Sequence, residues 1–324
     1  MNSLFMKLNS FVLQNSMKGY SGAVTNRFQI KKFHRSSRYY KITEEELKKH
    51  QEEIMSRGLP EKKPIPGVKN VLLVASGKGG VGKSTTAVNL SVALKFLAQG
   101  KKVGILDTDV YGPSIPLMMN LREAPTLTKD NKMEPLQNYG VKCMSMGFLV
   151  DEKSPVLMRG LMVMSVIDKL LRNVEWGDLD YLVVDTPPGT GDTHISLIQN
   201  VPISGVVLVT TPHEAALQVC GRGALMFTKL RVPIIGIVQN MSRVICQNCN
   251  TDLKIFGTGT EQLAFQLGLE MLEDIPLDPN ISAGSDTGKP VLVVSPDSRQ
   301  SISYLNLAAK VMKFLENQEK KSQT

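Results

Sequence analysis

Residues 77–85 read Gly77-Lys78-Gly79-Gly80-Val81-Gly82-Lys83-Ser84-Thr85. This segment fits the phosphate-binding pattern G-x-x-x-x-G-K-[ST], and it lies between a predicted strand and a predicted helix, the context that the pattern requires. Glycines let successive backbone N–H groups curl around an anion, and the N-terminus of the following helix adds a partial positive charge. We therefore expect a nucleotide site in which Lys83 neutralises the β- and γ-phosphates and the Ser84 hydroxyl coordinates Mg²⁺.

Short apolar runs alternate with helical segments around this loop. The pattern predicts strands at residues 71–75, 103–106, 141–146, 181–184, 206–209 and 234–238. It predicts helices at residues 84–98, 160–172, 214–230, 260–267 and 301–315. Most of the predicted strands are continuously apolar, as strands buried on both faces should be. We therefore predict an α/β fold, namely a doubly wound, mostly parallel sheet with helices on both faces.

Carboxylates follow two of these predicted strands. Asp107 and Asp109 come after the strand at 103–106, and Asp185 follows the strand at 181–184. The carboxyl ends of parallel strands meet at one edge of a sheet, where such folds bind ligands. We expect all three carboxylates at the nucleotide, with Asp185 holding Mg²⁺ directly or through water. The guanine-reading pattern N-K-x-D is absent from the sequence, which favours ATP.

The positive charge of the chain is confined to its beginning. The 324 residues contain 38 Lys and Arg against 30 Asp and Glu, yet residues 1–43 hold eight basic residues and no acid. A basic, acid-free leader with apolar residues at helical spacing predicts a mitochondrial transit peptide over residues 1–40, cleaved among residues 33–40. A basic tail that binds acidic surfaces is the alternative. The remaining chain is neutral, so its charge does not predict nucleic-acid binding.

The body has the composition of a globular domain, with 42% hydrophobic residues in the chain. No apolar run approaches the roughly 20 residues of a membrane-spanning helix, so we expect at most peripheral membrane contact. Residues 41–67 are predicted to form a helix, opened by the capping box Thr43-Glu44-Glu45-Glu46, and a proline-rich linker. An ATPase domain is predicted for residues 68–316, and a polar, frayed tail for residues 317–324.

Four cysteines in so long a chain do not make a disulfide framework, which predicts a reducing compartment such as the mitochondrial matrix. Cys246 and Cys249 are spaced as a metal-binding or redox pair. Two thiolates cannot complete the four-cysteine coordination of a [4Fe–4S] cluster or a structural zinc. Cys143 and Cys220 lie in a predicted strand and helix and are expected to be core residues. We therefore expect a second subunit to supply the other two ligands. The alternatives for what the cysteine pair does are binding an iron–sulfur cluster, binding zinc, and acting as a redox dithiol.

Lys78 makes the phosphate loop resemble the deviant Walker A class, which includes the Min and Par partition ATPases and the nitrogenase iron protein. In that class two subunits face each other across paired nucleotides, and the extra lysine reaches into the partner's site. Residues 107–114, 185–192 and 239–242 narrow the resemblance to the Mrp/ApbC iron–sulfur carriers. Residues 55–60, 144–150, 159–165 and 283–288 resemble the mitochondrial branch, which supplies clusters to respiratory complex I.

The resemblance implies an ATP-dependent carrier that binds a [4Fe–4S] cluster across a homodimer and delivers it to apoproteins, here complex I subunits. It implies slow ATP hydrolysis with Lys78, Lys83 and Asp109 as catalytic residues, and adenine recognition by Asn240. Residues 215–223 depart from the family pattern, which usually has an Asp and a Lys there. A partition-type ATPase that positions cargo, and a zinc-bridged or non-hydrolysing nucleotide-binding scaffold, are the alternative functions.

Overall fold

A computed structural model describes residues 62–150, 160–246, 248–249 and 251–323 of the chain. All of them belong to one compact unit, residues 58–324. The predicted transit peptide and the helix expected at the start of residues 41–67 lie outside the described residues.

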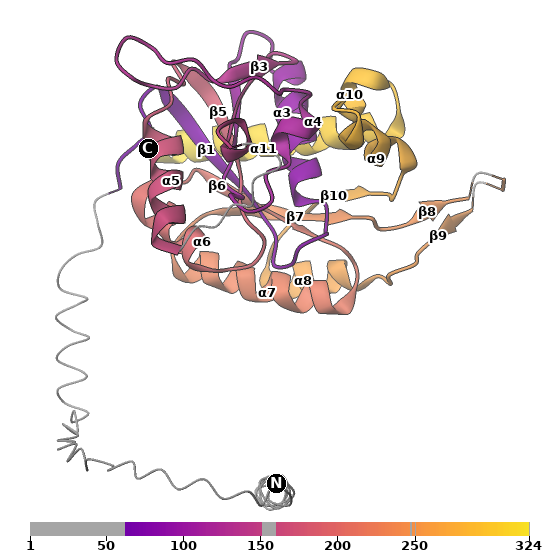
Figure 1. Ribbon diagram of the computed structural model, residues 1–324. Coiled ribbons are helices and arrows are strands. Elements are labelled where there is room, and N and C mark those ends of the chain that lie inside the picture. Colours follow the sequence, from indigo (N-terminus) through magenta and orange to yellow (C-terminus); the bar gives the residue numbers. More distant parts are fainter. Residues whose placement is uncertain (1–61, 151–159, 247, 250, 324) are drawn as a thin grey trace, which may run out of the picture. The chain divides into compact units, whose positions relative to one another are not determined.

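An eight-stranded sheet forms the centre of this unit, in the order β10-β7-β6-β1-β5-β2-β4-β3 (Figure 1). Every neighbouring pair is parallel except β3 and β4, so the predicted fold class is confirmed. The strands are β1 (Val68–Ala75), β2 (Val103–Asp107), β3 (Leu136–Asn138), β4 (Val141–Ser145), β5 (Leu179–Asp185), β6 (Gly205–Thr210), β7 (Ile234–Asn240) and β10 (Met271–Ile275).

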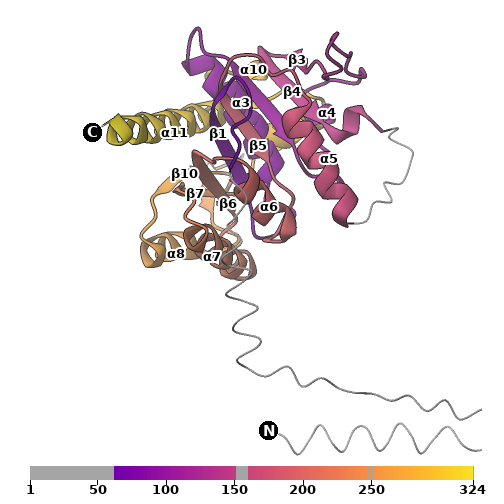
Figure 2. The same ribbon diagram turned by 90° about the vertical axis from the view of Figure 1, so that its left-hand side faces the viewer.

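Helices cover both faces of the sheet. Figures 1 and 2 show α3 (Lys83–Leu97) and α11 (Arg299–Gln323) on one side, with α6 (Asp192–Asn200), α7 (Glu214–Lys229) and α8 (Gly259–Leu267) on the other. The described elements also include α4 (Ile115–Met118), the 3₁₀ turn η1 (Met146–Phe148), α5 (Gly160–Arg172), α9 (Pro279–Asp286), α10 (Val291–Val294) and the small hairpin β8 (Val244–Ile245) and β9 (Asp252–Leu253). Among the described residues, no helix has the length and apolar character needed to cross a bilayer.

The central strands are buried because their side chains are apolar on both faces. Residues 71–75 of β1 are all buried, and so are all residues of β2 and β6. The order in which strands are added to the sheet reverses at β1. The strands β5, β2 and β4 lie on one side of it, and β6, β7 and β10 lie on the other. This switch point places the loop that follows β1 in a crevice at the carboxyl edge, where open α/β sheets bind ligands.

Several elements differ from the prediction. The strands β3 and β10 and the helices α4, α6, α9 and α10 were not predicted, because they are short or carry a mixed polar pattern. A local signal did exist for α9, since Asp278 accepts a hydrogen bond from the Asn280 N–H at 2.8 Å and Pro279 takes the first helical position. The helix predicted at residues 301–315 is longer in the structure, because α11 continues to Gln323, with Glu319 paired to Lys69 at 3.0 Å.

Candidate functional site

The phosphate loop runs from the end of β1 into the first turn of α3. Gly80 and Gly82 have φ angles of 79° and 84°, a left-handed conformation that glycine adopts without strain. The loop borders a hollow of about 290 Å³. The predicted site residues that line it are Lys78, Gly79, Gly80, Gly82, Lys83, Ser84, Thr85 and Asp109. The Lys78 side chain is exposed.

A buried ion pair lies beneath this hollow. Lys83 Nζ is 2.6 Å from Asp185 Oδ1 and 3.0 Å from Ser84 Oγ. Burial raises the pKa of Asp185, and the charge of Lys83 opposes that shift. The second carboxylate oxygen, Oδ2, is buried without a hydrogen-bond partner. Asp185 and Ser84 therefore fit a magnesium ion, which Asp185 would hold directly or through water.

The two carboxylates after β2 have different surroundings. Asp107 is buried, and its oxygens accept hydrogen bonds from the backbone N–H groups of Asp109, Ser114 and Ile115 and from the Ser145 hydroxyl, at 3.0 to 3.4 Å. Burial, followed by the nearby Asp185 charge, raises the Asp107 pKa to about 7. Asp107 thus organises residues 107–115 rather than lining the hollow. Asp109 does line it, and accepts a hydrogen bond from Gly112 N–H at 3.3 Å.

Asn240 connects the end of β7 to the phosphate loop. Its side-chain amide donates a hydrogen bond to the Val81 carbonyl at 2.9 Å, and a side chain at Gly82 would lie 2.0 Å from the same nitrogen. A second hollow of about 260 Å³ adjoins the phosphate hollow, because Gly82, Thr85 and Met118 line both. Asn240, Met241, Leu277 and residues of α9 complete its lining, so it has the size and position for a nucleoside.

Sequence reasoning missed the buried polar contacts that Thr186 and His194 make near Lys83. The Thr186 hydroxyl donates to the Val74 carbonyl at 3.0 Å, and so accepts from His194 Nε2, also at 3.0 Å. His194 Nδ1 is buried without a partner. Burial, with a smaller effect of the Lys83 charge, lowers the His194 pKa to about 4. Residues 192–194 follow the predicted Asp185 segment directly, but no local pattern shows which way this histidine points.

Cys246 and Cys249 lie on the β8–β9 hairpin, which projects from the body of the unit (Figure 1). The Cys246 N–H donates to the Thr251 carbonyl at 3.0 Å, and the Cys249 thiol lies 3.2 Å from the Thr251 hydroxyl. Hydrogen bonds to the Cys249 sulfur from the Thr251 hydroxyl, from the Thr251 backbone and from Cys246 lower the Cys249 pKa and so favour the thiolate that binds metals. Cys143 and Cys220 are buried core residues, as predicted.

The pair supplies only half of a four-ligand site. Among the described residues, no three His, Cys, Asp or Glu side chains gather as a metal site. The hairpin presents its two thiols at the surface, where ligands from another chain can approach.

Comparisons with known proteins show the family of the chain. The family model described as the ParA-type NUBPL iron-transfer P-loop NTPase matches residues 67–312. The "Iron-sulfur cluster transfer protein NUBPL" of Mus musculus is 56% identical over 274 residues, which cover 84% of this chain and 86% of that protein. The "Iron-sulfur protein required for NADH dehydrogenase, mitochondrial" of Arabidopsis thaliana is 53% identical over 252 residues, covering 78% and 80%.

The fold comparison finds an ADP complex. The nucleotide-binding protein of Archaeoglobus fulgidus, solved with ADP, superposes with a TM-score of 0.62 at 35% identity and covers 73% of this chain and 92% of its own. The predicted family resemblance and the predicted P-loop fold are both confirmed.

Two glycines of the loop make a matched test. Gly80→Ala and Gly82→Ala both place a side chain at positive φ, which costs about 1–2 kcal/mol. Only Gly82→Ala also displaces Asn240, because nothing lies within 4 Å of a side chain at Gly80. Losing the Asn240–Val81 hydrogen bond adds about 1–3 kcal/mol. Urea unfolding should therefore find Gly82→Ala less stable than Gly80→Ala. Equal losses would contradict the proposed contact.

His194 predicts a pH-dependent stability. Its pKa of about 4 in the folded state lies below the ordinary value of 6.5, so between these values the unfolded chain binds a proton that the folded chain does not. The free energy of unfolding therefore falls as the pH drops from 7 to 5, by about 2 kcal/mol from this residue. The raised pKa of Asp107 makes the free energy of unfolding rise as the pH drops, but this effect is the same in wild type and in the variant His194→Gln. Urea unfolding of wild type and His194→Gln at both pH values isolates the histidine; parallel losses would refute its role.

Proposed function

The chain belongs to the ParA-type family of NUBPL iron-transfer P-loop NTPases, and from this we propose that it is an ATP-dependent carrier of [4Fe–4S] clusters in the mitochondrial matrix. Two copies hold one cluster between them, with Cys246 and Cys249 of each copy as ligands. The cluster is cargo, which the dimer delivers to apoproteins.

The observation that carries this proposal is the pair of surface thiols on a projecting hairpin. Four thiolates are needed for a [4Fe–4S] cluster, and a second copy related by two-fold symmetry supplies the same two again. A cluster held by two ligands from each of two chains is released when the chains separate, whereas a site closed within one chain keeps its metal. The lowered pKa of Cys249 supports thiolate ligation at neutral pH.

The nucleotide site supports slow ATP hydrolysis. Lys83 exchanges its Asp185 contact for the β- and γ-phosphates, and the backbone N–H groups of the loop orient them. Ser84 and Asp185 would hold Mg²⁺, which would neutralise part of the phosphate charge. Asp109 orients the attacking water, whose oxygen bonds to the γ-phosphorus as the bond to the leaving ADP oxygen breaks. Lys78 of the other subunit stabilises the negative charge on the transferred group. Asn240 recognises adenine from the adjoining hollow.

The relatives indicate the destination of the cluster. The Arabidopsis relative is named as required for NADH dehydrogenase in mitochondria, and the mouse relative as a cluster transfer protein. The basic leader of this chain fits import into the same organelle. We therefore propose complex I subunits as recipients. A zinc-bridged dimer is the second candidate, because four thiolates also satisfy zinc.

Anaerobic reconstitution with iron and sulfide tests the cargo. Wild type should gain visible charge-transfer absorbance, with about four iron atoms and four sulfides per dimer. Cys246→Ala and Cys249→Ala should each lose the absorbance and the bound iron, because either change removes two of the four ligands from the dimer. Cys143→Ala is the control, since that thiol is buried elsewhere and should leave the yield unchanged. Tightly bound zinc without a cluster would refute the proposal.

Mixing two inactive variants tests whether Lys78 acts across the dimer. Lys83→Ala lacks its own phosphate lysine, and Lys78→Ala lacks the residue donated to its partner, so each alone should hydrolyse ATP at background rate. An equal mixture should recover about a quarter of wild-type turnover, because about half of the dimers are mixed and each of those has one complete site. A mixture of Lys83→Ala with Asp109→Ala is the control: if Asp109 serves its own site, no complete site forms. Failure of the first mixture to recover would exclude the donated lysine.

A further inference from the structure

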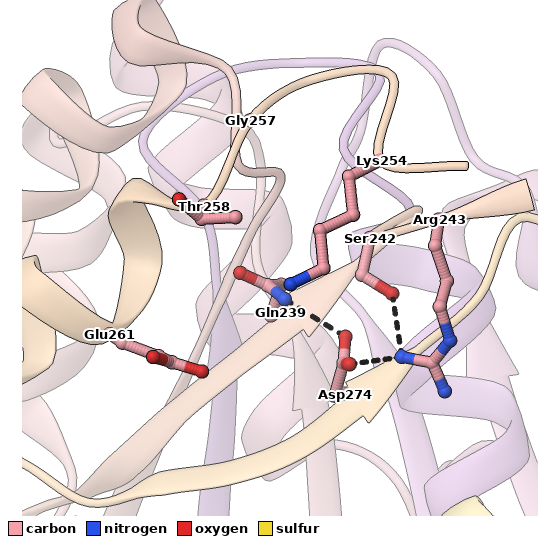
Figure 3. A pocket seen from close by; sticks show the side chains of 8 residues that line it. All are labelled: Gln239, Ser242, Arg243, Lys254, Gly257, Thr258, Glu261 and Asp274. Atoms are coloured by element: carbon pink, nitrogen blue, oxygen red, sulfur yellow. Dashed lines mark hydrogen bonds and ion pairs between the residues drawn. The ribbon is translucent and has the colours of Figure 1, made fainter. Parts of the chain in front are cut away.

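The root of the cysteine hairpin contains an arginine between two carboxylates. Arg243, directly before β8, forms an ion pair with Asp274 on β10, and its Nε lies 3.2 Å from Asp252 Oδ2 on β9. The Arg243 side chain is only 13% exposed. Figure 3 shows its guanidinium pointing toward Asp274 and the Ser242 hydroxyl. Arg243 therefore links the central sheet to the far strand of the hairpin.

Gln239 and Asn240 connect this arginine and its carboxylates to the nucleotide site. Gln239 on β7 donates a hydrogen bond to the other oxygen of Asp274 at 2.9 Å (Figure 3). The next residue, Asn240, donates to the Val81 carbonyl of the phosphate loop. Met241 follows with a φ angle of 54° and lines the nucleoside hollow. A single stretch, residues 239–246, thus connects the phosphate loop to the first cysteine.

In the part of the hairpin that the structure describes, the two strands pair over a short length. The hairpin pairs only two residues on each strand and forms a sheet separate from the central one. A two-stranded hairpin of this size is marginally stable by itself, so its direction depends on contacts at its root. Two backbone hydrogen bonds hold this root. The Ser242 N–H donates to the Ile275 carbonyl at 3.1 Å, and the Leu277 N–H donates to the Arg243 carbonyl at 2.9 Å. Asp252 on β9 is tied to the same root through Arg243.

We propose that Arg243 is a positioning residue that couples the nucleotide site to the cysteine pair. A bound nucleotide displaces Asn240 and Met241, this shift moves Arg243, and Arg243 carries Asp252 and β9 with it. The distance between the thiols of the two subunits then depends on which nucleotide is bound. This inference rests on the proposed function, since it explains how ATP binding or hydrolysis changes the grip on the cluster.

Alkylation of Cys249 in the iron-free protein tests the coupling without any cluster. The rate of modification by iodoacetamide is measured by peptide mass spectrometry with Mg–ADP and with a non-hydrolysable Mg–ATP analogue. The protein is diluted until light scattering reports a monomer, so that burial between two copies cannot change the rate. In wild type the two rates should differ by about fivefold or more, the lower end of typical allosteric coupling.

Asp252→Asn and Arg243→Gln should bring the ratio of the two rates close to one, while ADP affinity, measured by titration, stays within about twofold of wild type. A purely structural role, or a change in local charge, would alter both rates together and leave their ratio intact. Lys254→Gln is the matched control, because this exposed lysine lines the small pocket of Figure 3 together with Arg243 and Asp274, and its loss should leave the ratio unchanged. Arg243→Lys keeps the positive charge but lacks the planar N–H donors of the guanidinium. It should therefore retain part of the difference between the two alkylation rates.

A wild-type ratio near one, or a normal ratio in Asp252→Asn, would overturn the proposal. Asp252 is about half exposed on the hairpin, so this variant decides the question even if Arg243→Gln fails to fold. The outcome is also separable from the carrier function. Loss of the ratio in the variants while wild type binds no cluster would refute the carrier and leave the coupling in place. A cluster in wild type with unchanged ratios would do the reverse.

Discussion

The buried contact between Lys83 and Asp185 is the interaction on which the functional edge of this protein depends. It joins the first turn of α3 to the end of β5 across 2.6 Å, in surroundings where a single unpaired charge would be strongly destabilising. The same lysine is the one that we propose for binding the nucleotide phosphates. A phosphate that binds Lys83 would compete with the Asp185 carboxylate, so nucleotide binding would rearrange the charges beneath the loop. Asp107 and His194 lie near enough to this pair for its charges to affect their pKa values.

Environment divides the four cysteines into two kinds. Burial raises the pKa of Cys143 to about 12 and that of Cys220 to about 11, so both thiols remain protonated and inert. Hydrogen bonds lower the pKa of the exposed Cys249, which lies beside Cys246 on the hairpin. Among the four cysteines, the thiols suited to metal binding are thus those of the exposed hairpin. This arrangement agrees with a cargo shared between copies.

A short stretch of chain joins a contact of the phosphate loop to the cysteine hairpin. Only five residues separate Asn240, which contacts the loop, from Cys246. The connecting residues contact β10 through the Ser242–Ile275 hydrogen bond and the Arg243–Asp274 ion pair, and Leu277, just after β10, donates a hydrogen bond to the Arg243 carbonyl. A change at the nucleotide site can therefore be transmitted to the thiols through a short, polar and partly buried segment. An exposed linker of the same length would lack these contacts.

The sequence alone determined the class of fold, the phosphate loop, the family and the two-thiol pair, because each depends on residues that are neighbours in the chain. Spacing of glycines, continuous apolar runs and a C-x-x-C pattern all carry local physical meaning. Only the tertiary structure decided that Asp107 supports residues 107–115 instead of lining the hollow, that His194 is buried behind Lys83, and that α9 closes the nucleoside hollow. Arg243 gave no signal in the sequence, since its partners lie 9 and 31 residues away and only folding brings them together.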